Sequence, residues 1–373
     1  MPCENADSVE TFRQHDKRCV APIEHTSYDG CESDSAAIRQ GEAMTTSARI
    51  LSSLCLSMLA GPVISQVPEG LTGTLIVLNK AGDDASFIDL ASGELVATLP
   101  TGDDPHELIV TDDGRWAIGT NYRGGNSLTV FDIENLSVAR TIDLSAHPQP
   151  HGVLLVPGQE RVIVTAEGSS QLIVVDFHGG DIETSIETGQ PGSHMVALSE
   201  DGSMAFTANT QGNSVSVVDV AAAETLRVLD VPARPEAITT NRSATDVWVG
   251  SNDEGTVSVI DPADGRVRRQ LAGFSWPYRI LLTEDERYVV IPDARAEVLH
   301  VFDAESGEEL GKLDFSGSGP QGVALYPDDR TLFLSLSRRG KVAVVDIETM
   351  QVLGEYEAGS GPDGIGFSML QVR

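Results

Sequence analysis

The chain has few cysteines and few basic residues, and each shortage excludes a class of protein. All four cysteines (Cys3, Cys19, Cys31, Cys55) precede residue 66, so the rest of the chain has no disulfide of its own and no thiolate chemistry. Lys and Arg number 25 against 56 Asp and Glu, which gives a net charge of -31. Such an excess repels nucleic acid phosphates and anionic lipid, so no nucleic-acid partner is expected.

Helical periodicity and the familiar catalytic motifs are also missing. The glycine-rich turns lack the strand-to-helix context of a phosphate-binding loop, and no Gly-x-Ser-x-Gly sequence occurs. These absences exclude Rossmann, kinase and serine hydrolase folds of the usual kind.

The start of the chain has the composition of a leader. Residues 44 to 65 follow the layout of a secretory signal peptide, with one basic residue (Arg49) before an apolar stretch and small residues at the end. Residues 1 to 43 are polar and predict a disordered or spurious leader. The alternative is a membrane anchor, but the apolar run is short and rich in serine, so no stable membrane insertion is expected after signal removal. The predicted location is therefore periplasmic or secreted.

From residue 71 the sequence repeats a unit of four short β-type runs. The third run of each copy ends in aspartate, and successive aspartates are 42 to 44 residues apart. A period near 43 with four strands per copy is typical of a propeller blade. The seven aspartates are Asp89, Asp132, Asp176, Asp219, Asp261, Asp303 and Asp346.

Seven copies predict an all-β, seven-bladed β-propeller over residues 71 to 373, a single domain expected to be monomeric. Residues 362 to 373 supply only a first strand, and residues 71 to 100 supply only the last three. Pairing of these ends in one split blade would close the ring and remove the free sheet edges that promote aggregation.

The repeat also resembles a known family. Phe206-Thr207-Ala208-Asn209, followed by the run from Asn213 to Asp219, is similar to the YVTN-repeat family of secreted bacterial propellers. The resemblance covers residues 71 to 373 and implies the propeller fold. Related rings serve as surface proteins, binding modules, lactonases, lyases and metalloenzymes, so the resemblance leaves the function open.

Equivalent positions in the copies show where the ring is specialised. The inner strand of each blade lines the central channel, and its opening position follows proline in most copies. We expect this position to lie at the mouth of the channel, at the face where the blade-to-blade loops emerge. Histidine occupies it in three consecutive copies and in no other. In chain order the residues at this position are His106, His151, His194, Glu236, Tyr278, Gln321 and Asp363.

A second position ends the second strand and is expected to open on the same face, beside the inner ring. In chain order its residues are Asn79, Asn121, Glu167, Asn209, Asn252, Asp293 and Ser337. Asparagine is the most frequent, and Glu167, Asp293 and Ser337 depart from it. From the two rings we predict the ligand-binding residues Asn121, Asn209, Glu236, Tyr278, Asp293, Gln321 and Asp363.

The three histidines raise the question of a metal ion. Neutral imidazoles of His106, His151 and His194, with the Glu167 carboxylate, are ligands suited to zinc, copper, manganese or iron. Other carboxylates of the rings (Glu236, Asp293, Asp363) would suit calcium or magnesium instead. The alternative is that the histidines recur by duplication and fill a wet channel mouth.

Three functions fit these residues. The first is binding of a small ligand, a metal ion or a protein partner at the channel mouth. The second is a metal-assisted lactonase or lyase in which His151, Glu167 and Arg279 are catalytic, because the opening Pro148 to Val153 resembles that of seven-bladed lactonases. The chain departs from those enzymes in having Glu-Gly-Ser from position 167 in place of an Asp-Arg pair. The third is a protein-interaction scaffold without chemistry.

Overall fold

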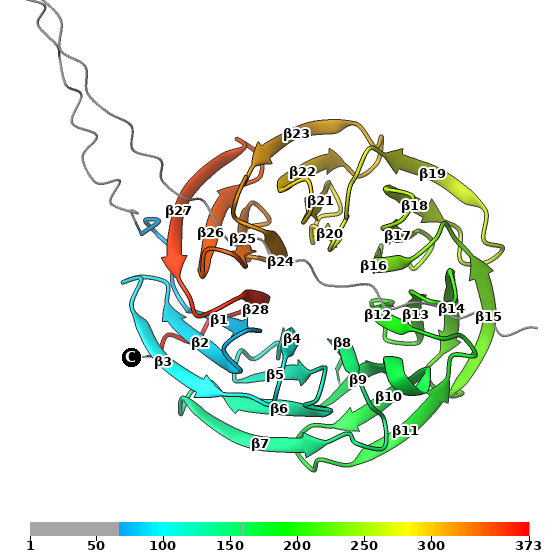
Figure 1. Ribbon diagram of the computed structural model, residues 1–373, viewed down its shortest axis with the longest axis horizontal. Coiled ribbons are helices and arrows are strands. Elements are labelled where there is room, and N and C mark those ends of the chain that lie inside the picture. Colours follow the sequence, from blue (N-terminus) through cyan, green and yellow to red (C-terminus); the bar gives the residue numbers. More distant parts are fainter. Residues whose placement is uncertain (1–66, 159, 373) are drawn as a thin grey trace, which may run out of the picture. The chain divides into compact units, whose positions relative to one another are not determined.

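The computed structural model describes residues 67-158 and 160-372, which form a ring of seven four-stranded antiparallel sheets (Figure 1). This arrangement confirms the predicted all-β, seven-bladed propeller. The predicted leader (1 to 43) and signal peptide (44 to 65) lie outside the described residues. Within the part of the chain that the structure describes, no helix has the length and apolar character needed to span a membrane.

The first four blades hold strands β28 and β1 to β15. Blade 1 consists of β28 (Pro362–Ser368), β1 (Thr74–Asn79), β2 (Asp84–Asp89) and β3 (Leu95–Pro100). Blade 2 consists of β4 (Pro105–Val110), β5 (Trp116–Asn121), β6 (Ser127–Asp132) and β7 (Ser137–Asp143). Blade 3 consists of β8 (Pro150–Leu155), β9 (Arg161–Ala166), β10 (Gln171–Asp176) and β11 (Ile182–Glu187). Blade 4 consists of β12 (Ser193–Leu198), β13 (Met204–Asn209), β14 (Ser214–Asp219) and β15 (Glu224–Asp230).

The remaining three blades hold β16 to β27. Blade 5 consists of β16 (Pro235–Thr240), β17 (Val247–Ser251), β18 (Thr256–Ile260) and β19 (Val267–Ala272). Blade 6 consists of β20 (Leu281–Leu282), β21 (Tyr288–Asp293), β22 (Val298–Asp303) and β23 (Glu309–Asp314). Blade 7 consists of β24 (Pro320–Leu325), β25 (Thr331–Leu336), β26 (Lys341–Asp346) and β27 (Gln351–Glu357). A single 3-10 turn, η1 (Glu167–Ser169), follows β9.

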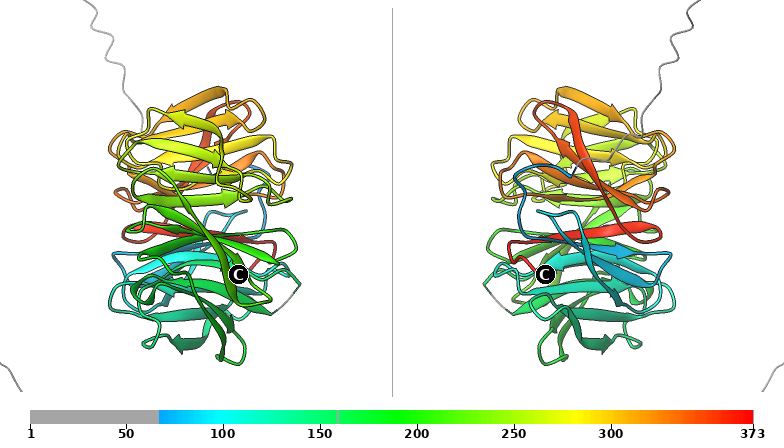
Figure 2. Two further views of the ribbon diagram at one scale, coloured as in Figure 1. Left: turned by 90° about the vertical axis from the view of Figure 1, so that its right-hand side faces the viewer. Right: turned by 90° about the vertical axis from the view of Figure 1, so that its left-hand side faces the viewer.

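The ring closes through the predicted split blade. The C-terminal strand β28 pairs antiparallel with β1, with Thr74 opposite Ser368 and Ile76 opposite Gly366. The pairing places the red strand beside the blue one in Figure 1, and the edge-on views of Figure 2 show the same neighbours. The Thr74 hydroxyl also donates a 2.7 Å hydrogen bond to the Leu370 carbonyl. Both ends of the described chain are thus held in one sheet.

The repeated aspartates have a structural role at the turn between the third and fourth strands. In each blade the carboxylate accepts a backbone N–H hydrogen bond from the turn that follows, as Asp89 does from Ser92 at 2.8 Å and Asp219 from Ala222 at 2.8 Å. The repeated asparagines have a similar role one turn earlier. Asn209 donates to the hydroxyls of Ser214 (3.1 Å) and Ser216 (2.9 Å), which ties the end of the second strand to the third.

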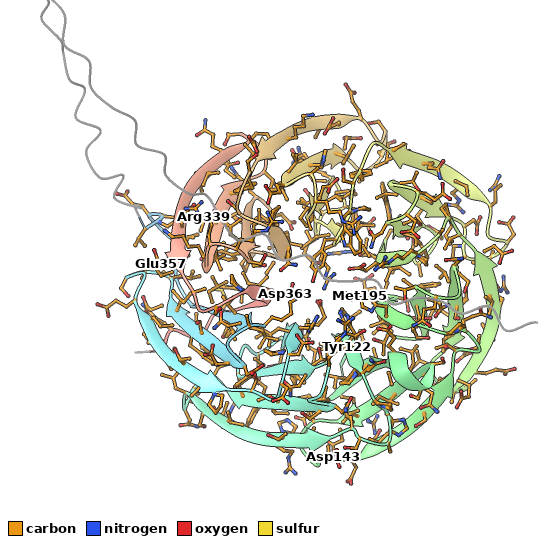
Figure 3. The ribbon with its side chains drawn as sticks, in the orientation of Figure 1. Tyr122, Asp143, Met195, Arg339, Glu357 and Asp363 are labelled. Atoms are coloured by element: carbon orange, nitrogen blue, oxygen red, sulfur yellow. The ribbon has the colours of Figure 1, made fainter. Side chains whose placement is uncertain are left out.

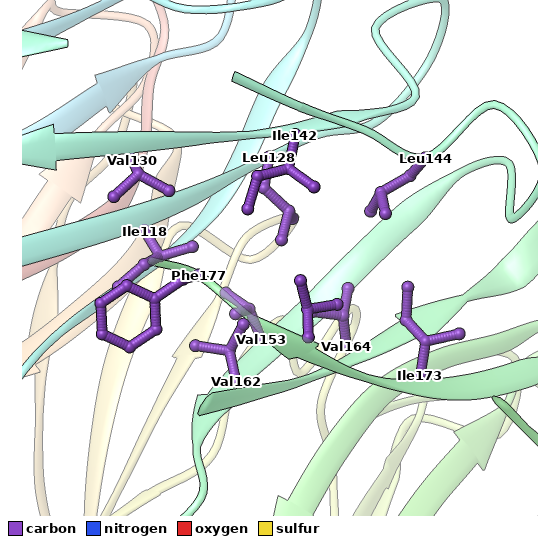
Figure 4. Close-up of a cluster of buried hydrophobic side chains, with 11 residues drawn as sticks. Ile118, Leu128, Val130, Ile142, Leu144, Val153, Val162, Val164, Ile173 and Phe177 are labelled. Carbon is purple, nitrogen blue, oxygen red and sulfur yellow. The ribbon is translucent and has the colours of Figure 1, made fainter. Parts of the chain in front are cut away.

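Apolar side chains fill the space between neighbouring blades. Between blades 2 and 3, Ile118, Leu128 and Val130 pack on Val153 and Val164 of the next blade (Figure 4). The alternating strands direct one set of side chains toward each neighbouring blade, so both faces of every sheet are covered. Similar clusters occur at the other blade interfaces.

The inner strands carry a bulge at the position where the candidate site begins. In blade 2, Pro105 lies opposite Asn121 but Leu108 lies opposite Gly119, a shift of one residue. The same irregularity interrupts the inner-strand pairing of blades 1, 3, 4, 5 and 7. A bulge changes the direction in which side chains face. Neighbouring inner strands approach closely here, since a Cβ atom on Gly364 would collide with the backbone carbonyl oxygen of His106 in β4.

Candidate functional site

The three opening histidines lie side by side on β4, β8 and β12. The ring centres of His106 and His151 are 5.0 Å apart, and those of His151 and His194 are 3.7 Å apart with a 30° angle between the planes. Tyr122, at the end of the second strand of blade 2, packs edge-on against all three rings at 4.8 to 6.1 Å. Figure 3 shows Tyr122, Met195 and Asp363 near the centre of the ring. We call His106, His151 and His194 the imidazole cluster.

Hydroxyl groups from neighbouring blades fix the backbone of this cluster. Thr120, the penultimate residue of β5, donates a 2.9 Å hydrogen bond to the carbonyl of His151. Thr165, at the equivalent place in β9, donates to the carbonyl of His194 at 2.6 Å. His151 and His194 are therefore each held by the second strand of the preceding blade, and both threonine side chains are fully buried.

Glu167 connects two members of the site. One of its oxygens, Oε2, accepts a 2.5 Å hydrogen bond from the Tyr122 hydroxyl and lies 2.8 Å from Nδ1 of His194. A carboxylate at Nδ1 holds the proton on that nitrogen and leaves Nε2 as the acceptor or ligand atom of the imidazole. The side chains of Glu167 and His194 are 11% and 13% exposed, so the pair is only partly screened by water.

Burial decides the charge of the cluster. It lowers the pKa of His106 to about 4, even though nearby Asp363 raises it. The pKa of His151 lies well below its ordinary value, because burial and the neighbouring histidines disfavour the imidazolium form. Burial also raises the pKa of Glu167, but the hydrogen bonds from His194 and Tyr122 outweigh it and the pKa is lowered. At neutral pH the site thus combines two neutral imidazoles with an ionised carboxylate.

A second polar network lies beside the cluster. Asp363, which is fully buried, is 2.6 Å from Nζ of Lys80 and accepts a 2.9 Å hydrogen bond from the hydroxyl of Tyr278. Lys80 Nζ is also 3.5 Å from Nε2 of His106. Burial raises the pKa of Asp363, but the positive charges of Lys80 and Arg279 outweigh it and the pKa is lowered. Asp363 is therefore an ionised, compensated carboxylate.

One ion pair crosses the channel. Arg279, in blade 6, donates to Oε1 of Glu107 in blade 2, and its NH1 group donates a 2.7 Å hydrogen bond to the Tyr278 carbonyl. The two side chains are 8% and 14% exposed. Burial lowers the pKa of Arg279 to about 10, so the guanidinium stays charged at neutral pH.

A depression opens beside the Glu167–His194 pair, with a volume of about 310 Å³. We call it the mouth depression, and its residues come from the loops and inner-strand openings of blades 2 to 5: Tyr122, Arg123, Glu167, His194, Thr210, Gln211, Asn213, Arg234, Glu236 and Asp253. The exposed Arg123 stacks on the Tyr122 ring at 5.1 Å. Arg234 lies 4.7 Å from the ring of Trp276, which Arg295 contacts from 4.0 Å.

The predicted metal ligands are brought together, but not as a metal-binding group. Among residues 67-158 and 160-372, no three His, Cys, Asp or Glu side chains are arranged to hold an ion. The physical reason is that the tilted rings of His151 and His194 lie directly against each other. In addition, Nδ1 of His194 faces Glu167 and Nδ1 of His106 faces the Asp104 carbonyl. A common ion at the three histidines is thus not shown.

The predicted catalytic set is spread over two compartments. Glu167 lines the mouth depression, whereas Arg279 lines a separate central cavity and pairs with Glu107. His151 is 2% exposed, and its Nδ1 atom has no hydrogen-bond partner. The inner strand of blade 6 also differs from expectation, because it is reduced to Leu281–Leu282 and the residues before it form only an isolated bridge from Pro277 to Asp293.

The predicted ligand-binding residues divide into two groups. Glu236 lines the mouth depression, and Tyr278 and Asp363 belong to the network of Lys80. Three second-strand residues of the predicted set use polar atoms within the blades. Asn121 and Asn209 bond to their own third strands, and Asp293 accepts backbone N–H groups of its loop. Gln321 is half-buried, with an Oε1 atom that has no partner.

Sequence reasoning missed Tyr122, Lys80 and Glu107. Tyr122 and Lys80 both follow the asparagine that ends a second strand, a position that was not compared between copies. Glu107 occupies the third inner-strand position, where only blades 2 and 6 carry a charge. A comparison of that position would have found an acidic and a basic residue among Glu107, Gly152, Met195, Ala237, Arg279, Gly322 and Gly364.

Comparisons with known proteins agree with the fold. The family model of the cytochrome D1 heme domain matches residues 77–238, less than half of the chain. Kuenenia stuttgartiensis hydrazine synthase is similar in structure, with a TM-score of 0.63 and 18% identity over 71% of this chain and 90% of that one. A functionally unknown protein from Desulfotomaculum acetoxidans has a TM-score of 0.66 and 14% identity over 80% and 99%. No curated protein matches. At these identities the likeness shows the β-propeller fold alone.

Proposed function

We propose that this protein is an exported β-propeller of the YVTN-repeat type that binds a small hydroxycarboxylate at the mouth depression, with its carboxylate on Arg123 and its hydroxyl donating to Nε2 of His194. The observation that carries the proposal is the Tyr122–Glu167–His194 network, which holds an oriented imidazole at the wall of the depression. The volume of about 310 Å³ matches the lower end of small-molecule sites.

Within the depression, the exposed guanidinium of Arg123 offers a place for an anion. Glu167 already accepts from Tyr122 and His194, with Gln211 at 3.5 Å, so its oxygens have little capacity left for a cation. Arg123, in contrast, has no carboxylate within salt-bridge distance in the described part of the chain, and its guanidinium is exposed. A carboxylate pairs well with a guanidinium because two parallel N–H donors match its two oxygens.

The cytochrome D1 match raises haem as a cofactor, and the residues fit it in one respect only. His194 has the carboxylate partner at Nδ1 that a metal-ligating imidazole commonly has. The depression, at about 310 Å³, is smaller than a tetrapyrrole macrocycle requires. Haem therefore has no place in the proposal.

Calorimetric titration of the full chain with acetate, succinate and citrate tests the proposal. Citrate, which carries carboxylates and a hydroxyl, should bind, and acetate and succinate, which lack the hydroxyl, should bind more weakly. Arg123→Gln should weaken citrate binding about ten-fold, the loss expected for a hydrogen bond to a charged group, and His194→Gln about five-fold, the loss expected for a neutral hydrogen bond. Arg266→Gln, at an exposed turn of blade 5, is the matched control and should leave the affinity unchanged. Absence of binding, or a His194-dependent Soret shift on adding haemin, would overturn the carboxylate assignment.

A metal-assisted enzyme at the same site is the second candidate, favoured by the neutral state of His106 and His151. Only neutral imidazoles bind metal ions, and the low pKa values keep both rings in that form at neutral pH. Ion binding would require the stacked rings to separate. Metal analysis of protein purified without added metal tests this candidate. A content below about 0.2 equivalents, with no gain on reconstitution with zinc or copper, would rule it out.

A further inference from the structure

A central cavity along the inner strands is separate from the mouth depression and unused by the proposed function. It has a volume of about 610 Å³ and lies along the inner strands of the ring. Its wall is mainly apolar, with half-exposed side chains such as Met195, Leu281, Ala324 and Phe367. Cavities of this size and character are the usual sites for small ligands.

The only charged side chains in its wall are Glu107, Arg279 and Glu284. Glu107 and Arg279 form the cross-channel ion pair, which is an unusual feature in an apolar wall because burying two charges costs free energy. The Arg279 guanidinium has five N–H donors, and its two hydrogen bonds go to Glu107 and to the Tyr278 carbonyl. Among the described residues, no further hydrogen-bond acceptor is found for the remaining donors.

We propose that this central cavity binds an uncharged amphiphile, with an apolar chain along the inner strands and a terminal polar group at the Arg279–Glu107 pair. The proposal concerns a different site from the mouth depression and does not depend on it. The free N–H groups of Arg279 call for an acceptor on the ligand. The Glu107 oxygens call for a donor. A primary amide or an alcohol offers both.

The charge balance of the pair selects a neutral head group. Arg279 is compensated by Glu107, and the neighbouring Asp363 is compensated by Lys80. A carboxylate or an ammonium placed beside these pairs would be an additional, uncompensated charge in a mainly apolar cavity. Burial of such a charge is costly, whereas a hydrogen-bonded neutral group is tolerated.

Calorimetric titration of the full chain with four ten-carbon probes tests the selection: decanamide, decanol, decanoate and decyltrimethylammonium, all below their micellar concentrations at pH 8. Decanamide and decanol should bind saturably at one site. Decanoate and the ammonium probe should bind at least ten-fold more weakly. Ala324→Phe, which fills the apolar part of the cavity, should abolish binding of decanamide, whereas Arg266→Gln should have no effect.

Two charge variants should change which probe binds most tightly, a result that a merely structural ion pair would not produce. Glu107→Gln leaves the arginine uncompensated, so decanoate should become the tightest probe; Arg279→Gln should favour the ammonium probe in the same way. A reversal of preference in either variant supports the proposal. It is overturned if no probe saturates the natural protein, if decanoate binds it as tightly as decanamide, or if Ala324→Phe binds decanamide unchanged.

Discussion

Protonation of the buried imidazoles should destabilise the fold at mildly acidic pH. His106 has a folded-state pKa of about 4, against about 6.5 for an unfolded histidine, and that of His151 is lowered in the same direction. A group whose pKa is lower in the folded state binds protons mainly after unfolding. Stability is therefore full above pH 6.5 and declines as the pH falls toward the folded-state pKa.

The size of the decline follows from the two pKa values. For His106, the free energy of unfolding should fall by about 2 kcal/mol between pH 7.5 and pH 5, and the lowered pKa of His151 acts in the same direction. Acidic groups contribute little in this window, because the lowered pKa of Asp363 or Glu167 matters only near and below pH 4.5. Burial raises the pKa of Glu236, which acts in the opposite direction and offsets part of the loss.

Equilibrium unfolding in urea at pH 7.5, 6.5, 5.5 and 5.0 measures this effect. The midpoint should move to lower urea with an unchanged m-value, and His106→Asn with His151→Asn should remove most of the dependence. His178→Asn, at a half-exposed position of blade 3, is the control and should retain it. The reasoning is refuted if the natural protein is equally stable at pH 7.5 and 5.0, or if the double variant declines as steeply.

Three further substitutions test the contacts that hold the site. Thr120→Val should cost about 2 kcal/mol of unfolding free energy in urea, because it leaves the carbonyl of His151 without its donor; a loss below about 0.5 kcal/mol would show that the inter-blade bond is unimportant. Asn209→Ala should cost about 2 kcal/mol by breaking the ties to the third strand, and an unchanged melting temperature would contradict that role. Arg279→Met should lower the free energy of unfolding by about 3 to 5 kcal/mol, because it leaves the buried Glu107 carboxylate without its partner. The double variant Arg279→Met, Glu107→Gln should lose less, and equal losses in the two variants would argue against the ion pair.

The fold could be predicted because its signal repeats seven times. A period of 42 to 44 residues with aspartate at the end of each third strand specifies the blade, and the incomplete units at both ends specify the split closure. The same repetition explains the limit of the prediction. Asparagines such as Asn209 recur because every blade needs the tie between its second and third strands, so their recurrence carried information on structure and not on a ligand.

Part of the site was also predictable, because His106, His151 and His194 share one position in consecutive blades and do meet. Their arrangement was not, since the edge-on packing against Tyr122 and the pairing of His194 with Glu167 depend on side-chain geometry that no spacing encodes. The location of Arg279 was missed for another reason. The inner strand of blade 6 is reduced to Leu281–Leu282, so Arg279 lies outside the regular pairing from which its place in the ring was predicted.

An imidazole nitrogen NMR spectrum of the full chain at pH 7, recorded during titration with citrate, tests the central claim most directly. The ring resonances of His194 should move as the mouth depression fills, with smaller changes at its stacking partner His151. Those of His178 and His300, outside the depression, should stay in place. If the resonances of His194 remain fixed while citrate binds, or if only the outer histidines respond, the mouth depression is not the binding site.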